Sequence, residues 1–533
     1  MAHHNSSPQK PQSQTKPQIQ AHDMYFIVPS KPYLDNSPTK HQLFNLSDLS
    51  REAISVFRLS FPIALTALLF YSRSAISMLF LGSLGDLSLA AGSLAIAFAN
   101  ITGYSVLSGL SLGMEPLCSQ SFGANNPKLL SLTLHRSVLF LLCSSLPISF
   151  LWLNMSPLLL FFGQDPEITR LAQKYLIFSL PDLFSFSLIH PIRIYLRSQG
   201  ITFPLTLAAA IAAIFHLPTN FLLVTHFGLG PTGVAAAASG SNLLLLLSLL
   251  LYIRHDPAIS LGPTKESLIG WAPLARLAFP SCVSVCLEWW WYELIILLCG
   301  LLPDPKSTVA SMGVLIQTTS LLYVFPSSLG FGVSARVGNE LGANHPFQAR
   351  SAAVVSISIA AAMGVCAMGF AFSMKNIWAG FFTNDNQIQQ LTAAALPIIG
   401  LCELGNCPQT VGCGVLRGSA RPAHAAHVNL GAFYIVGFPV AVILAFKLDL
   451  GFRGFWMGLL AAQVCCAGLM LYVVASTDWI AQAHRAQVLT SIGTVIKDIE
   501  EGKVGKEIEA DDYEKREECY EPLIAVSTTQ IEH

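Results

Sequence analysis

Three glutamates lie within apolar stretches of this sequence, where a charge is costly. Glu288 and Glu293 belong to the segment Cys286–Gly300, and Glu403 belongs to a second apolar segment. An ionisable group at bilayer depth costs several kcal/mol unless it is protonated, paired or facing water. We therefore predict that these acids hold a proton or a cation. An interfacial or ion-paired glutamate is the alternative interpretation.

Polar residues accompany Glu288 at helical spacing. At about 100° per residue, Ser281, Ser284 and Tyr292 fall on the same helical stripe as Glu288. The stripe predicts that Glu288 faces a cavity. Glu293 is five residues further on, roughly 140° around the helix, so we expect it to do a different job.

Glu403 has polar neighbours on its own helical face. Asn406 follows at the third position and Thr410 at the seventh, and Pro397 and Pro408 are expected to break the span. A polar stripe on a discontinuous helix is the usual setting of a transporter site, and a glutamate hydrogen-bonded for packing is the alternative. A carboxylate that holds either a proton or a cationic solute, but not both, is the simplest physical basis of antiport. Our candidate cavity residues are Tyr292, Gln317, Asn406 and Thr410.

The first half of the chain carries a different set of charges. Arg73 and Asp182 fall inside apolar segments, and a buried charge needs a partner. We predict that they pair, either to fix the geometry of this half or to meet an anionic group of a substrate. Glu115 and Glu340 lie at the ends of apolar segments and are interpreted as structural.

Composition sets the class of protein in which these residues act. Of the 533 residues, 53% are hydrophobic and 11% are charged, whereas soluble domains carry about 25% charged residues. The sequence therefore predicts an integral membrane protein. The net charge of −1 gives no footprint for nucleic acid. The cysteines and histidines lack metal-ligand spacing and no nucleophile–base pattern appears, so we expect no enzyme activity, no cofactor and no metal.

Twelve apolar segments have about the 20 residues that a bilayer core requires. Backbone in lipid must satisfy its own hydrogen bonds, so we predict an all-α membrane protein with twelve transmembrane helices. The expected spans are 57–80, 89–112, 129–152, 167–190, 203–226, 232–253, 274–301, 308–331, 349–372, 388–415, 423–446 and 454–475.

The chain repeats itself at a nearly constant offset. Gly113–Pro127 aligns without gaps with Gly332–Pro346, so the offset is 332 minus 113, or 219 positions. Phe161–Ile168 and Phe381–Ile388 repeat at nearly the same offset. We predict two six-helix bundles from an ancestral duplication, related by a pseudo-two-fold axis along the membrane normal, with the substrate path between them. The expected divisions are an N-terminal arm at 1–50, a first lobe at 51–255, a linker at 256–273, a second lobe at 274–478 and a C-terminal tail at 479–533.

Basic residues give the orientation in the membrane. Eleven Lys and Arg fall on the side of the N-terminus and five on the other, which predicts that both termini are cytosolic. The arm at 1–50 is rich in polar residues and is expected to be disordered. In the tail, Tyr520–Leu523 has the form of a peptide that binds sorting or autophagy adaptors, a pattern that is common by chance.

Several long motifs resemble those of one transporter family. Cys286–Trp290 with Glu293, Gly332–Pro346, Leu401–Gln409 and Gly414–Pro422 resemble the multidrug and toxic compound extrusion (MATE) family, and within it the plant detoxification carriers. The resemblance runs from about residue 51 to residue 479. It implies a V-shaped pair of six-helix bundles that exchanges protons for solute. The acids that carry coupling in eukaryotic members map onto Glu288 and Glu403.

One departure concerns the first lobe. Bacterial relatives often keep a coupling aspartate in the first span, where this chain carries Arg73, so we expect coupling in the second lobe. We predict a monomeric proton-coupled antiporter that moves an organic cation, secondary metabolite or hormone out of the cytosol, across an endomembrane or the plasma membrane. A lipid-linked flippase of related architecture, and a non-transporting sensor or scaffold that acts through its tails, are the competing hypotheses.

Overall fold

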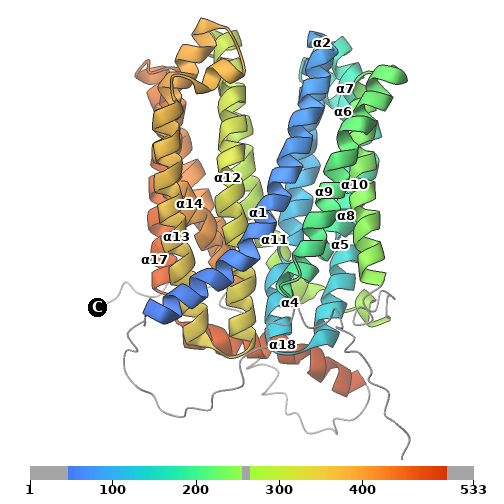
Figure 1. The fold of residues 1–533 in the computed structure, drawn as a ribbon, viewed down its shortest axis with the longest axis vertical. Helices are drawn as coiled ribbons and strands as arrows, with labels where there is room; N and C mark the ends of the chain where they lie inside the picture. The colour runs from blue at the N-terminus through green and yellow to red at the C-terminus, as the bar shows by residue number, and fades with distance from the viewer. Residues whose placement is uncertain (1–45, 255–264, 501–533) are drawn as a thin grey trace, which may run out of the picture. The chain divides into compact units, whose positions relative to one another are not determined.

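A computed structural model describes residues 46–254 and 265–500, which all belong to one compact unit, Phe44–His533. Nearly all of these residues are helical (Figure 1). The first lobe contains α1 (Leu46–Ser83), α2 (Asp86–Ala99), the π-helix η1 (Asn100–Tyr104), α3 (Ser105–Ser111), α4 (Met114–Gly123), α5 (Pro127–Leu153), α6 (Met155–Phe161), α7 (Pro166–Phe178), α8 (Leu180–Ser198), α9 (Phe203–Asn220), the π-helix η2 (Phe221–His226) and α10 (Pro231–Arg254).

A short 3₁₀ helix, η3 (Lys265–Leu268), precedes the second lobe. That lobe contains α11 (Ala272–Cys299), α12 (Pro305–Gly342), α13 (Pro346–Met374), η4 (Trp378–Phe381), α14 (Asn386–Gly418), α15 (Pro422–Asn429), the π-helix η5 (Leu430–Gly437), α16 (Phe438–Val442), the π-helix η6 (Ile443–Lys447) and α17 (Phe452–Ala475). One more helix, α18 (Trp479–Glu500), follows.

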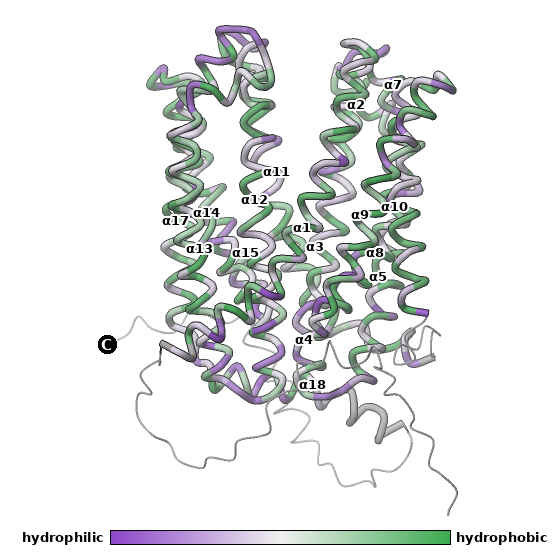
Figure 2. The backbone as a smooth tube through the Cα atoms, viewed as in Figure 1, coloured by the Kyte–Doolittle hydropathy of each residue, from purple (hydrophilic) through white to green (hydrophobic). Residues whose placement is uncertain are grey.

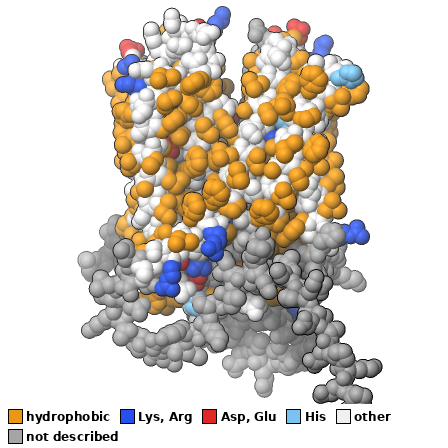
Figure 3. All heavy atoms as spheres, in the orientation of Figure 1, with side chains coloured by type: hydrophobic (Ala, Val, Ile, Leu, Met, Phe, Trp, Pro, Cys, Tyr) orange, Lys and Arg blue, Asp and Glu red, His pale blue; other side chains and the backbone are white. Residues whose placement is uncertain are grey.

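The helices confirm the predicted fold class, an all-α membrane protein built from two bundles. Among the described residues, 11 helices are long and apolar enough to cross a membrane, and α7 with α8, bent by 43°, make a twelfth span if they are counted together. Apolar residues occupy the middle of both bundles and polar residues gather at their ends (Figure 2). Large apolar side chains such as Phe150 and Leu297 are 71% and 69% exposed, which suits a surface that contacts lipid (Figure 3).

The sequence repeat reappears as repeated local structure. Asn125 and Asn344, at equivalent positions of the two Gly-Ala-Asn turns, both adopt the left-handed conformation, with φ of 55° and 61°. Asparagine tolerates this conformation better than most residues. Asp165 and Asp385, also at equivalent positions, cap the N-termini of α7 and α14 through their side-chain oxygens. The duplication thus conserves the residues that turn the chain between spans.

The first helix of each lobe packs against the opposite lobe. A Cβ atom on Gly332 of α12 would collide with the Ser60 hydroxyl of α1, and a Cβ on Gly113, just before α4, would collide with the main chain of Ala278 in α11. Ser60 and Ala278 are repeat equivalents, as are Gly113 and Gly332. The two glycines therefore allow the same close crossing twice, once in each direction.

The lobes also meet at a second place, which we call the α4 contact: α4 together with the last turns of α12 and α14. A Cβ atom on Gly123 would collide with the Asn339 carbonyl, and one on Gly342 with the Gln120 carbonyl. Main chain therefore touches main chain across the lobes here. At the opposite end of the molecule, a hollow separates the two bundles (Figure 3).

Prolines act differently in the two lobes. The bend between α7 and α8 falls at Ser179, two residues before Pro181. Pro397 and Pro408, by contrast, lie inside one continuous helix, α14, so the expected break of that span is wrong. Packing against α12, α13 and α17 holds α14 together, and neighbouring helices commonly support a proline in this way. The motif Tyr520–Leu523 and most of the arm at 1–50 lie outside the described residues.

Candidate functional site

Glu403 is buried in the second lobe among neutral hydrogen-bond donors. Its side chain is 2% exposed. The Asn406 amide donates to Glu403 Oε2 over 2.9 Å, and the Cys407 thiol lies 3.5 Å from the same oxygen. Gln463 of α17 donates in turn to the Asn406 side-chain oxygen over 3.4 Å. No described cation forms an ion pair with Glu403.

The main chain around Glu403 is tightly enclosed. A Cβ atom on Gly364 of α13 would lie 2.7 Å from the Glu403 carbonyl oxygen, and one on Gly405 would lie 2.8 Å from the Gln463 carbonyl oxygen. Glycine at these two positions lets α13 and α17 approach α14 closely. Close helix packing therefore buries Glu403.

Glu288 lies on α11 beside a second set of neutral partners. The side chains of Tyr323 on α12 and Gln409 on α14 lie within electrostatic reach of its carboxyl group. The Gln409 amide also reaches the side-chain oxygen of Asn429, over 3.4 Å. Asn429 donates to the Ser284 hydroxyl over 3.1 Å, so the serine that precedes Glu288 on the predicted stripe belongs to this network.

Tyr292 lies within electrostatic reach of both acids. The electrostatic partners of its hydroxyl include both Glu403 and Glu288. The structure therefore places Glu288, Tyr292, Glu403 and Asn406 in one polar cluster inside the second lobe, which we call the C-lobe cluster together with Tyr323, Gln409, Asn429 and Gln463. Because a phenol donates and accepts hydrogen bonds, Tyr292 is chemically suited to stand between two carboxyl groups that change their charge.

The other predicted residues of this lobe lie at the edge of the C-lobe cluster or outside it. Glu293 is half-buried on α11, and no described residue forms a hydrogen bond or an ion pair with it. Thr410 is buried and its hydroxyl contacts the Gln409 side chain over 3.3 Å. Gln317 is half-buried on α12, and its carbonyl accepts a hydrogen bond from Tyr71 of α1 over 3.5 Å. Glu293 therefore lies apart from the two acids of the C-lobe cluster, whereas Thr410 contacts the cluster through Gln409.

In the first lobe, the side chains of Arg73 and Asp182 are joined by a third residue. Arg73 Nη2 donates to Asn242 Oδ1 over 2.7 Å, and Asn242 Nδ2 donates to Asp182 Oδ1 over 2.7 Å. The Tyr104 hydroxyl reaches the other oxygen of Asp182 over 3.4 Å. The predicted pair is thus bridged by an amide, and Nε and Nη1 of Arg73 have no hydrogen-bond partner among the described residues.

Sequence reasoning missed half of the C-lobe cluster. Tyr323, Gln409, Asn429 and Gln463 were not singled out, although each is a polar residue within an apolar span. A search for every uncharged polar residue at span depth would have found them, together with Asn242 in the first lobe. No group of three or more metal-ligating side chains occurs in the described part of the chain.

Two six-helix lobes that meet along a pseudo-two-fold interface, with two acids at bilayer depth inside one lobe, define a multi-pass membrane transporter. Comparisons with known proteins give the family. The MatE family model matches residues 62–222 and 280–443, one match in each lobe. This chain belongs to the MATE family of transporters.

Individual relatives agree with this assignment. The chain is 61% identical to Protein DETOXIFICATION 51 of Arabidopsis thaliana over 90% of both chains, and 60% identical to Protein DETOXIFICATION 52 of the same plant over 84% of this chain and 88% of that one. The crystal structure of the eukaryotic MATE transporter AtDTX14 superposes with a TM-score of 0.78 at 30% identity, covering 82% of this chain and 99% of that chain. The resemblance inferred from the sequence is therefore confirmed.

Proposed function

We propose that this transporter is a proton-coupled antiporter that moves an organic solute out of the cytosol by alternating access. One observation carries the proposal: Glu288 and Glu403 lie in one lobe, each beside neutral polar side chains and within electrostatic reach of the same phenol. An organic cation, a secondary metabolite or a hormone is the expected class of solute.

The neutral partners matter because they leave the charge of each acid free to change. A cation bonded directly to a carboxylate holds it ionised, whereas amide, thiol and hydroxyl groups can hydrogen-bond to the ionised or the protonated form. Glu403 has only such groups as hydrogen-bond partners among the described residues. A proton and a cationic solute then compete for the same carboxylates, and this competition couples their movements in opposite directions.

The arrangement of the lobes supports alternating access. The lobes touch main chain to main chain at the α4 contact and are separated by a hollow at the other end (Figure 3). We assign the α4 contact to the cytosolic side because basic residues are concentrated in the connections on that side. The transporter then works as a monomer with both termini in the cytosol, in an endomembrane or the plasma membrane, and the proton gradient alone supplies its driving force.

Transport by the purified protein in lipid vesicles tests the proposal. Vesicles with an acidic interior should accumulate radiolabelled tetraethylammonium, or another solute from a panel of cations and plant metabolites, and the uptake should stop when the proton gradient is collapsed. Glu288→Gln and Glu403→Gln should each abolish this uptake, while Glu293→Gln, on the same helix as Glu288 but outside the cluster, should retain it. Full gradient-driven uptake by both of the first two variants would refute the assignment.

A further inference from the structure

Arg417, in the last turn of α14, reaches across the lobe interface. Its Nε lies 3.4 Å from Glu115 Oε2 of α4, and Arg197 of α8 bonds the other oxygen of the same carboxylate over 2.8 Å. Both guanidinium groups also lie over the ring of Phe331 on α12, at 5.3 and 4.4 Å from its centre. Glu115 is 1% exposed, so two arginines share one buried carboxylate at the α4 contact.

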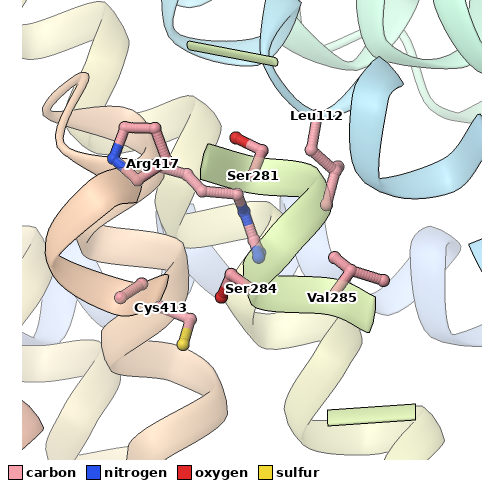
Figure 4. Close-up of a pocket in the computed structure, with 8 residues that line it drawn as sticks. Leu112, Ser281, Ser284, Val285, Cys413 and Arg417 are labelled. Carbon is pink, nitrogen blue, oxygen red and sulfur yellow. The ribbon is translucent and has the colours of Figure 1, made fainter. Parts of the chain in front are cut away.

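On its other side, Arg417 borders a small pocket that leads toward Glu288. The pocket is lined by Ser281 and Ser284 of α11 and by Cys413 of α14. In Figure 4 the Arg417 side chain extends from α14 toward α11 and ends beside Ser284, one helical turn before Glu288. Arg417 and Glu288 attract each other electrostatically. The same guanidinium therefore lies between a carboxylate of the opposite lobe and a carboxylate of its own lobe.

The charges that directly face Arg417 balance only when Glu288 is ionised. Arg197 and Arg417 carry two positive charges, and Glu115 supplies one negative charge. An ionised Glu288 supplies the second negative charge, whereas a protonated Glu288 leaves buried Arg197 and half-buried Arg417 repelling each other across one carboxylate. The charged and titratable groups that face Arg417 are Glu115 of α4, Arg197 of α8, Glu288 of α11, Tyr323 of α12 and Cys413 of its own helix.

We propose that Arg417 is a positioning residue that links the charge on Glu288 to closure of the lobes at the α4 contact. The proposal rests on the proposed function, because it takes Glu288 as a proton site. With Glu288 ionised, closing the lobes brings together two balanced pairs, Glu115 with Arg197 and Glu288 with Arg417. When Glu288 takes up a proton, closure removes water from Arg417 and leaves it with Glu115 as its only charged partner, which it shares with Arg197. Proton uptake therefore favours separation of the lobes at α4, where Arg417 regains water.

Distances between spin labels on the two lobes test this link. Lys128 and Gln348 are exposed in the first turns of α5 and α13, on either side of the α4 contact. They would be changed to cysteine and labelled in a chain in which Cys143 and Cys366, the exposed cysteines of the described residues, and Cys519 of the tail are replaced by serine. Glu288→Gln, which mimics the protonated acid, should raise the ratio of long to short distances by roughly fivefold or more, the lower end of typical coupling between linked sites.

The decisive comparison is a double-mutant cycle. In an Arg417→Gln background, where the charges are balanced without Glu288, the Glu288→Gln substitution should leave the distances unchanged. Arg417→Lys keeps the charge and should keep the response, which separates a lost charge from a damaged fold. Arg421→Gln is the matched control, because Arg421 bonds to Ser419 and Thr477 within the second lobe only, and it should leave the response intact.

Two outcomes would overturn the inference: no change of distance with Glu288→Gln, or the same change with and without Arg417. Vesicle uptake by the same variants keeps this result distinct from the proposed function. If uptake requires Glu288 but the cycle shows no coupling, the link through Arg417 fails and the antiporter proposal stands. If uptake is independent of Glu288 while the distances respond through Arg417, the proton-site assignment fails and the electrostatic link stands as a property of the lobe interface.

Discussion

Gln120 of α4 and Asn339 of α12 occupy equivalent positions of the two repeats, 339 minus 120 or 219 residues apart, and make the same contact in opposite directions. Gln120 Nε2 donates to the Gly418 carbonyl over 3.0 Å, and Asn339 Nδ2 donates to the Ser198 carbonyl over 3.1 Å. Ser198 and Gly418 end α8 and α14, where carbonyls lack partners within the helix. Each lobe therefore satisfies a helix end of the other, and the pseudo-two-fold relation runs through the α4 contact.

The glycines of this contact should be intolerant of substitution. In Gly342→Ala, the added Cβ meets the Gln120 carbonyl, and overpacking of this kind costs about 1–3 kcal/mol. We expect the short distance between labels at Lys128 and Gln348 to become less populated, roughly fivefold or more. Gly313→Ala, on the same helix with no atom within 4 Å of the added Cβ, is the control. An unchanged distance distribution in Gly342→Ala would show that the closed contact has more room than the structure indicates.

Tyr292→Phe should slow transport without unfolding the protein. The substitution removes the hydroxyl within electrostatic reach of both Glu288 and Glu403 and keeps the ring. Without this polar group near the two acids, gradient-driven uptake should fall roughly tenfold or more, which corresponds to about 1.4 kcal/mol in the barrier. Tyr472→Phe, whose ring is 71% exposed, should transport normally. Equal uptake rates in the two variants would remove Tyr292 from the mechanism.

Much of the fold was predictable because its signals are local or repeated. The length and apolar character of the spans predict helices, and the equivalence of Gly113–Pro127 with Gly332–Pro346 predicts two lobes. The stripe through Glu288 correctly included Ser284, and the spacing that separated Glu293 from it agrees with their different surroundings. Such patterns depend on neighbours within two or three helical turns, which a sequence displays directly.

Contacts between distant segments were not predictable in the same way. Glu115 was interpreted as structural because it lies at the end of a span, and nothing in its neighbourhood indicates that its partners are Arg197 and Arg417. From the sequence alone, Arg417 is one of the basic residues near span ends that indicate the orientation in the membrane. Asn242 illustrates the same limit, since the pairing of Arg73 with Asp182 was expected but the amide that bridges them belongs to a third helix.

Asn242→Leu should destabilise the first lobe strongly. The substitution leaves Arg73 and Asp182 without the amide that joins them, and breaking a buried charged network by removing one partner costs about 3–5 kcal/mol. The midpoint of thermal unfolding in detergent should fall clearly below that of Ser248→Ala, a control on the same helix whose hydroxyl bonds only to its own backbone. Replacing all three residues, with Arg73→Met and Asp182→Leu, should recover most of the loss. No recovery in the triple variant would mean that the network is held for its shape and not for its charge balance.

The helix α18 should stabilise the closed lobes, because it bonds to both Gly-Ala-Asn turns. Gln487 Nε2 donates to the Gly342 carbonyl of the second lobe over 2.8 Å, and Asn126 of the first lobe donates to the Thr490 carbonyl over 3.2 Å. Separating the lobes at α4 pulls these two attachments apart, so one of them has to break.

Gln487→Ala should therefore shift the labels at Lys128 and Gln348 toward longer distances. A single hydrogen bond contributes about 0.5–1.5 kcal/mol, which corresponds to a change of roughly two- to tenfold in the ratio of the two populations. Ser491→Ala is the matched control, since its hydroxyl bonds only within α18, and it should leave the distances unchanged. If Gln487→Ala behaved like Ser491→Ala, α18 would move with the second lobe without restraining the first. Loss of its contacts would then not favour separation of the lobes.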